Sequence, residues 1–98
     1  MRKDETIHFD REGFSGDVYV NDEQNKGFNA LRVSVNGKHP QKKMLDHTRV
    51  YLVISGSGTF TIDNKSQEVQ IDDLYIIEPG SEYRYEGKME LFEFNILK

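Results

Sequence analysis

The chain has 98 residues, no cysteine, and a formal net charge of −4 from 17 acidic and 13 basic side chains. This length predicts a single domain over residues 1–98, and the lack of cysteine excludes disulfides, thiolate metal sites and a cysteine nucleophile. The acidic balance argues against a nucleic-acid partner, because nucleic-acid binding needs a basic surface. No apolar run is as long as a membrane helix or a signal-peptide core, so we expect a cytoplasmic protein without a membrane partner.

Short apolar stretches with strand-like alternation follow one another along the chain, and no helical period lasts beyond about two turns. The N-terminal segment around His8 is polar, and residues 21–27 have the composition of a loop. In chain order, the expected strands are residues 17–20, 28–35, 41–45, 50–54, 59–62, 69–71, 74–77, 83–85 and 89–96. This pattern predicts an all-β fold, an antiparallel jelly roll or small barrel.

Turn residues separate these stretches. Residues 36–37 (Asn-Gly) predict a turn because both tolerate positive φ. Residues 56–58 (Gly-Ser-Gly) predict a bend between two strands, and residues 63–64 (Asp-Asn) predict a hairpin turn. Residues 78–81 contain a proline and a glycine and predict a tight turn.

Two stretches, residues 37–56 and 72–87, resemble the two motifs of the cupin superfamily. The first motif is Gly, five residues, His-x-His, three or four residues, Glu, six residues, Gly; its positions correspond here to Gly37, Lys43, Leu45, Arg49 and Gly56. The second is Gly, five residues, Pro-x-Gly, two residues, His, three residues, Asn; its positions correspond to Asp72, Glu78, Gly80, Tyr83 and Gly87. The resemblance implies a cupin double-stranded β-helix, or jelly-roll, barrel.

The resemblance also implies where a metal would lie in this family. The ligand positions hold Lys43, Leu45, Arg49 and Tyr83 in place of the family's three histidines and one glutamate. A divalent first-row metal requires neutral imidazoles and carboxylates. Two cationic side chains at that position would instead repel the ion by roughly several kcal/mol. We therefore expect neither a metal nor another cofactor.

Strand alternation predicts which side chains point into the barrel. If Arg49 points inward, as the family's glutamate does, positions 51 and 53 do so too, and positions 50, 52 and 54 point outward. The expected ligand-binding residues are Lys43, Arg49, Tyr51, Tyr83 and Tyr85, with Leu45 as an apolar floor. Cations and phenols together favour a sugar or a carboxylate-like anion. In the structural alternative, the tyrosines fill the barrel and Arg49 pairs with an acid such as Glu78, Glu90 or Glu93.

The sequence leaves open whether a reaction is catalysed. Loss of the metal ligands favours a metal-free barrel that binds a small polar or anionic molecule and acts as an accessory protein or sensor. The alternative is an isomerase- or epimerase-like enzyme that acts on a sugar or keto acid by acid–base chemistry through Tyr83, Lys43 and His47. Because Lys42 precedes Lys43, a one-residue shift of register would exchange the two side chains.

Two further expectations concern the histidines and the assembly. His8, His39 and His47 are expected in exposed loops, and whether they contribute to an unconventional metal site stays open. The outward apolar residues at positions 50, 52 and 54 favour a homodimer that covers them. This argument lapses if they face a second sheet of the same subunit.

Overall fold

The structure, a computed structural model, describes residues 6–20, 27–44 and 46–97. These residues form one antiparallel sheet and contain no helix, which confirms the predicted all-β fold. The strands are β1 (Ile7–Arg11), β2 (Phe14–Val20), β3 (Phe28–Lys43), β4 (Thr48–Ile62), β5 (Lys65–Glu68), β6 (Leu74–Ile77) and β7 (Glu82–Ile96). Their order is β1-β2-β3-β7-β4-β5, and β6 pairs with β4.

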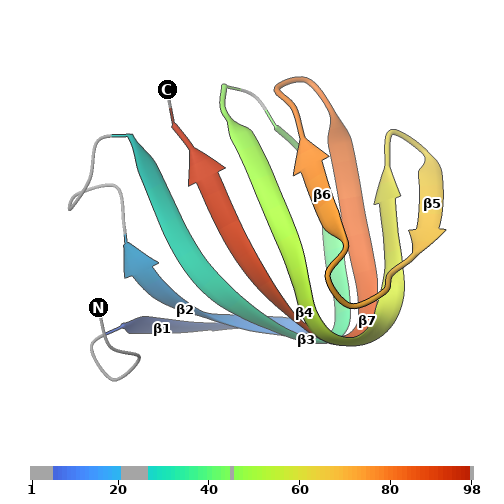
Figure 1. Ribbon diagram of the computed structural model, residues 1–98, viewed down its shortest axis with the longest axis horizontal. Helices are drawn as coiled ribbons and strands as arrows, with labels where there is room; N and C mark the ends of the chain where they lie inside the picture. The colour runs from blue at the N-terminus through green and yellow to red at the C-terminus, as the bar shows by residue number, and fades with distance from the viewer. Residues whose placement is uncertain (1–5, 21–26, 45, 98) are drawn as a thin grey trace.

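The three long strands β3, β7 and β4 fold the sheet over on itself (Figure 1). Each bends near its middle, so the two halves of one strand lie in two facing layers. The alternating inward side chains of both layers form the core, which contains Val33, Tyr51, Phe60, Tyr83 and Leu91. This doubled-over sheet is the arrangement of a jelly-roll barrel.

Glycines allow the bend where the long strands cross. Gly37 in β3 pairs with Gly87 in β7, which pairs with Gly58 in β4. Gly37 and Gly87 have φ values of 137° and 141°, and a Cβ on Gly87 would come within 2.4 Å of Ser57 O. The expected turn at residues 36–37 is therefore wrong: Gly37 bends one continuous strand.

Several other expected elements merge or shift. Residues 28–35 and 41–43 belong to one strand, β3, and residues 83–85 and 89–96 belong to β7. The bend at residues 56–58 lies within β4, and Gly56 has a φ of 97°. The sequence reading missed β1, although its apolar residues alternate.

The hairpin turn at residues 63–64 is confirmed, with φ values of 50° and 68°. The strand after it is β5, which pairs with β4 directly from the turn. The expected strand at residues 69–71 is therefore wrong, because the hairpin pairing has ended by Glu68. Of the expected loop at residues 21–27, positions 21–26 lie outside the described residues, as does Leu45.

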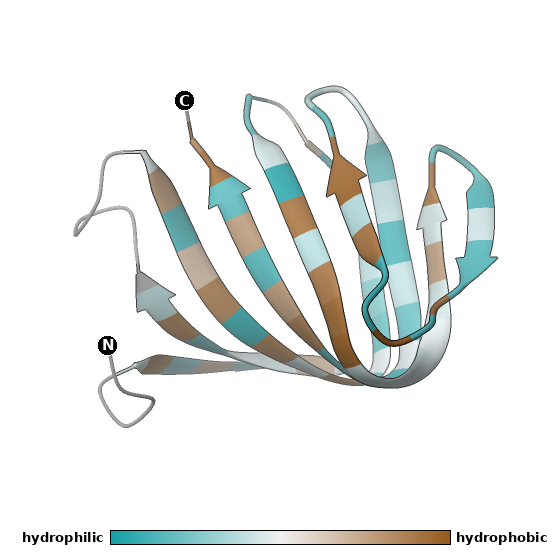
Figure 2. Cartoon of the chain, in the orientation of Figure 1, coloured by the Kyte–Doolittle hydropathy of each residue, from teal (hydrophilic) through white to brown (hydrophobic). Residues whose placement is uncertain are grey.

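Hydrophobic residues are frequent along β6 and the first half of β4, whereas the first half of β7, in the other layer, is mostly polar (Figure 2). On the layer that contains the first half of β4, positions 50, 52 and 54 point outward as predicted, whereas Tyr51 and Val53 are fully buried. The exposed apolar side chains of this layer are Leu52, Leu74, Ile76 and Ile96. No helix in the described part of the chain is long and apolar enough to cross a membrane.

Candidate functional site

Four of the five predicted site residues meet in the barrel interior. Arg49 and Tyr51 come from the first half of β4, whereas Tyr83 and Tyr85 come from the first half of β7, in the opposite layer. Because the strands bend, the two layers face each other, and Arg49 Nη1 donates a hydrogen bond to Tyr83 Oη at 2.6 Å. The two motif-like stretches therefore converge on one polar cluster.

Arg49 is also held by the second half of β7. Its Nε donates to Asn95 Oδ1 at 2.6 Å and lies 3.2 Å from Glu93 Oε2. Asn95 Nδ2 donates to Glu93 Oε2 at 2.9 Å and to Asn29 Oδ1 at 2.6 Å. The Arg49 and Glu93 side chains are only 14% and 9% exposed. Of the acids considered for the structural alternative, Glu93 is therefore the one that pairs with Arg49.

The phenols extend this polar cluster into the core. The hydroxyls of Tyr51 and Tyr83 lie 2.9 Å apart, which links Tyr51 to Arg49 through Tyr83. Tyr51, Tyr83 and Tyr85 are almost fully buried. The ring of Phe60 lies 5.2 Å from that of Tyr51 and 5.0 Å from that of Tyr85. The cluster thus has polar groups at its centre and aromatic rings around them.

Burial sets the protonation state of these groups. It raises the pKa of Tyr51, Tyr83 and Tyr85, and the Glu93 carboxylate raises the pKa of Tyr51 and Tyr85 further. Burial lowers the pKa of Arg49 and is the largest single effect, but attraction to Glu93 together with the contributions of Tyr51 and Tyr83 outweighs it, and the net direction is upward. At neutral pH the phenols are therefore neutral donors and Arg49 is a cation.

His39 adds a buried imidazole to the cluster. It lies within β3, opposite Tyr85, and its ring stacks on those of Tyr85 and Tyr83 at centroid distances of 4.7 Å and 5.3 Å. Burial lowers the pKa of His39, and its Nδ1 is buried without a hydrogen-bond partner in the described structure. His39 is thus a neutral base candidate beside two phenols.

The expectation that His39 lies in an exposed loop is therefore wrong. Pro40 has no backbone N–H and usually marks a strand edge. Here the register shifts between His39 and Lys42, and this bulge accommodates Pro40 within β3.

The same bulge moves Lys43 away from the cluster. Lys42 pairs with Tyr83, and Lys43 pairs with Glu82. Paired residues point to the same face of the sheet, so Lys43 lies on the side away from Tyr83, where it is exposed. Its expected inward orientation is wrong, and the one-residue shift of register has occurred.

The remaining histidines lie at the surface or near it. His8, on the exposed strand β1, lies 2.8 Å from Asp17 and 3.2 Å from Asp10. His47 Nδ1 lies 3.0 Å from Asp46 Oδ1, but the His47 side chain is only 20% exposed, so its expected exposed position is wrong. His8 therefore belongs to a strand and not to a loop.

The donor set at the motif positions does not fit a divalent cation. Arg49 is a permanent cation already paired with Glu93, Tyr83 is a neutral phenol, and Lys43 points away. Within residues 6–20, 27–44 and 46–97, no group of three or more His, Asp or Glu side chains is arranged to hold a metal ion.

Sequence reasoning missed His39, Asn95 and Asn29 as members of the cluster. Strand alternation contained a signal for two of them. Counting by twos from Val35 through Gly37 leads to His39, and counting by twos from Leu91 leads to Asn95. The assumed turn at residues 36–37 interrupted the first count.

Comparison with known proteins identifies the fold. No family model matches the chain, and no curated protein sequence matches it. Among solved structures, KdgF from Halomonas has a TM-score of 0.85 at 11% identity, over 99% of this chain and 91% of that one. An RmlC-like cupin from Shewanella frigidimarina has a TM-score of 0.84 at 13% identity, over 100% and 89%. The chain therefore has the cupin fold, as the motif spacing implied.

A third cupin-fold structure is Pac13 of Streptomyces, a nucleoside dehydratase. It has a TM-score of 0.88 at 24% identity, over 98% of this chain and 79% of that one. Solved forms of Pac13 with uridine include variants in which a tyrosine is replaced by phenylalanine or a histidine by glutamine. At these identities the likeness concerns the fold.

Proposed function

We propose that the barrel interior binds a small hydroxyl-rich molecule, a nucleoside or a sugar, without a metal ion. The interior cluster carries this proposal: Arg49, Tyr51, Tyr83 and His39 place charged donors, neutral hydroxyls and an imidazole within one aromatic enclosure. Sugar hydroxyls both donate and accept hydrogen bonds, and such a mixture complements them. Because Glu93 already neutralises Arg49, a neutral polyol fits better than the anion considered from the sequence.

The likeness to Pac13 makes a nucleoside the first ligand to test. Isothermal titration calorimetry with uridine, ribose and a panel of aldoses should show saturable binding at one site per chain. Tyr83→Phe removes the hydroxyl that bonds Arg49 and Tyr51 and should weaken binding about tenfold, the cost of about one hydrogen bond. Tyr19→Phe, on the outer surface beside Phe92, is the matched control and should bind normally. Failure of the whole panel to bind would contradict the proposal.

The metal-free part of the proposal has a separate measurement. Elemental analysis of protein purified without chelators should find nickel, iron, manganese and zinc far below stoichiometric amounts. A tightly held stoichiometric metal would contradict it.

One observation favours a second function, acid–base catalysis. His39 offers a neutral imidazole with an unpaired Nδ1, and among the phenols Tyr83 has Arg49 beside it, which offsets part of the rise in its pKa. In such a reaction His39 takes a proton from a carbon next to a carbonyl, and Tyr83 protonates the leaving hydroxyl. The C–O bond breaks, a C=C bond forms, and water leaves; the proton then returns from His39 to Tyr83. Lys43, part of the earlier enzyme hypothesis, is too exposed for this role.

Solvent exchange tests this second function. In D2O, the wild-type protein should introduce deuterium into a bound keto-sugar or nucleoside aldehyde, or release a dehydrated product, and His39→Gln should abolish this while still binding the ligand. Binding without exchange or product would favour the accessory or sensor role. The cytoplasmic location remains a prediction.

A further inference from the structure

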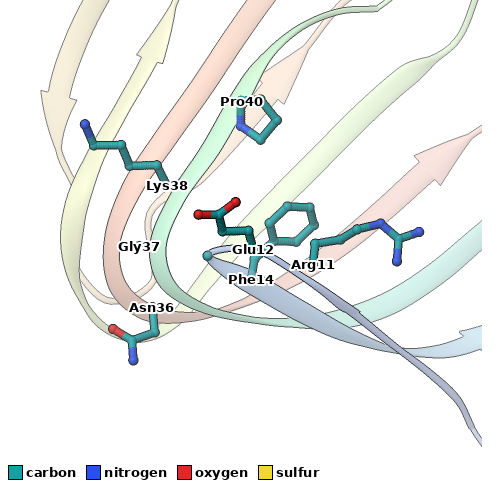
Figure 3. A pocket seen from close by; sticks show the side chains of 8 residues that line it. Arg11, Glu12, Phe14, Asn36, Gly37, Lys38 and Pro40 are labelled. Atoms are coloured by element: carbon teal, nitrogen blue, oxygen red, sulfur yellow. The ribbon is translucent and has the colours of Figure 1, made fainter.

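A groove lies outside the interior cluster, where the turn between β1 and β2 crosses the bend of β3 (Figure 3). Its volume is about 750 Å³, and it is lined by residues 11–14, residues 36–38 and Pro40. This volume lies within the range of small-molecule sites, about 300–1,000 Å³.

The backbone holds the groove in a defined shape. Asn36 N donates a hydrogen bond to Gly13 O at 2.9 Å, and a Cβ on Gly13 would come within 2.5 Å of Lys38 O. The turn therefore lies directly against β3, and the position of Gly13 requires glycine, with a φ of 89°.

Only one aromatic ring separates the groove from the cluster. Phe14 lines the groove, and its ring centroid lies 4.8 Å from that of His39. The His39 ring also stacks on the rings of Tyr83 and Tyr85. Phe14 therefore connects the groove to the aromatic rings of the interior cluster.

The side chains of the groove define the chemistry of its ligand. In Figure 3 the Glu12 carboxylate and the Phe14 ring lie toward Pro40, whereas the charged ends of Arg11 and Lys38 extend away. The groove therefore presents an aromatic face, a proline ring and a carboxylate acceptor. A planar ring that donates an N–H complements all three, whereas an anion is repelled by Glu12.

We propose that this groove binds the heterocyclic ring of the same ligand. The ring stacks on Phe14 and donates an N–H to Glu12, and its hydroxylated part reaches toward His39. This inference rests on the proposed polyol-binding function, and it narrows the ligand class from sugars in general to nucleosides whose base carries a ring N–H.

Matched ligands separate the groove from the interior. Binding of uridine, 3-methyluridine and ribose is measured by calorimetry for the wild-type protein, Glu12→Gln and Phe14→Leu. The wild-type protein should bind uridine about tenfold more tightly than ribose or 3-methyluridine, since the latter two lack the stacked ring or its N–H. Each variant should reduce this preference, and Glu12→Gln should leave ribose binding unchanged. Glu68→Gln, at a separate surface groove, should change nothing.

The outcomes distinguish the two proposals. Equal affinity for the three ligands, or an unchanged preference in Glu12→Gln and Phe14→Leu, would overturn the groove inference and leave polyol binding intact. Absence of binding by ribose and by both nucleosides would overturn both. A nuclear Overhauser effect between the uracil protons and the Phe14 ring gives an independent positive result, since it places the base in the groove.

Discussion

Arg49 is a buried cation, and its charge determines which of its neighbours it binds. The Glu93 carboxylate, on the neighbouring strand, forms an ion pair with the guanidinium. Asn95 Oδ1 and Tyr83 Oη each accept a hydrogen bond from the guanidinium. A carboxylate at position 49 would instead place two acids side by side, an arrangement that a metal ion would stabilise. Arg49 and Glu93 therefore form a self-contained ion pair in the interior.

Arg49→Met should cost about 3–5 kcal/mol in the free energy of unfolding, because it leaves the buried Glu93 without its cation. Arg32→Met is the control: its ion pair with Glu90 also joins neighbouring strands, but the side chains are 37% and 33% exposed, so the loss should stay below about 1 kcal/mol. Urea denaturation measures both. Combining Arg49→Met with Glu93→Leu should restore most of the loss; equal losses for Arg49→Met and Arg32→Met would contradict this account.

The buried His39 should make stability depend on pH. Its pKa in the folded protein lies below the usual 6.5, so on acidification the unfolded chain binds the proton first. The free energy of unfolding should therefore fall as pH decreases from about 6.5 toward the folded-state pKa. His8 has a raised pKa, so its effect on stability has the opposite sign. Its stabilising contribution is fully present below about pH 6.5 and is lost as pH rises through its folded-state pKa.

Denaturant titrations between about pH 5 and 8 isolate the His39 contribution in a His8→Asn background. Adding His39→Phe should flatten the decrease on the acidic side. An unchanged slope would show that the imidazole is not buried in its neutral form.

At the scale of the strands, the glycines decide the architecture. Gly37, Gly87 and Gly58 lie side by side on β3, β7 and β4, and side chains there would collide with the neighbouring backbone. The bend brings Tyr83, from one half of β7, opposite Arg49 and Glu93. The cluster exists because the glycines let its strands fold over.

Gly87→Ala should therefore destabilise the fold more than Gly80→Ala. Both positions have positive φ, 141° and 93°, so each substitution incurs a backbone penalty of about 1 kcal/mol. At Gly80 the added Cβ would meet nothing within 4 Å, whereas at Gly87 it would meet Ser57 O at 2.4 Å. We expect an additional loss of about 2 kcal/mol for Gly87→Ala, measured by urea denaturation. Equal losses would mean that the strands can separate at the bend without cost.

At the scale of the whole molecule, the two outer surfaces suggest how copies of the chain assemble. The layer containing β6 exposes 50% of Ile76 and 55% of Leu74, and the other layer exposes charged residues such as Arg84 and Glu86. In the described structure no second sheet of the same chain covers the apolar surface. Two identical apolar surfaces related by a twofold axis can cover each other, and we propose a homodimer on this basis.

Ile76→Lys should convert this dimer to a monomer at micromolar concentration, because it places a charge in the apolar contact. Ile7→Lys is the control: Ile7 is 60% exposed but lies on β1, at the opposite edge of the sheet, so the dimer should persist. Light scattering coupled to size-exclusion chromatography gives the mass. A wild-type monomer would contradict the proposal.

The sequence by itself determined the fold class and the orientation of most side chains in the interior. Alternation within β4 correctly placed Tyr51 and Val53 inward and Leu52 outward, because a strand of fixed period 2 leaves no other choice. The motif spacing correctly implied the cupin fold, since glycines and turns at fixed intervals reflect where the strands must bend. These properties are local, and local patterns encode them.

Only the tertiary structure decided which residues meet. The bulge after His39 changed the register by one residue, which turned Lys43 outward; a bulge depends on pairing with β7, which no local pattern reports. The partner of Arg49 was open among three acids until the pairing of β4 with β7 placed Glu93 Oε2 3.2 Å from Arg49 Nε. Strand register and strand bending together determine which distant segments are in contact. A one-residue shift of register turns inward side chains to the surface and outward side chains to the interior.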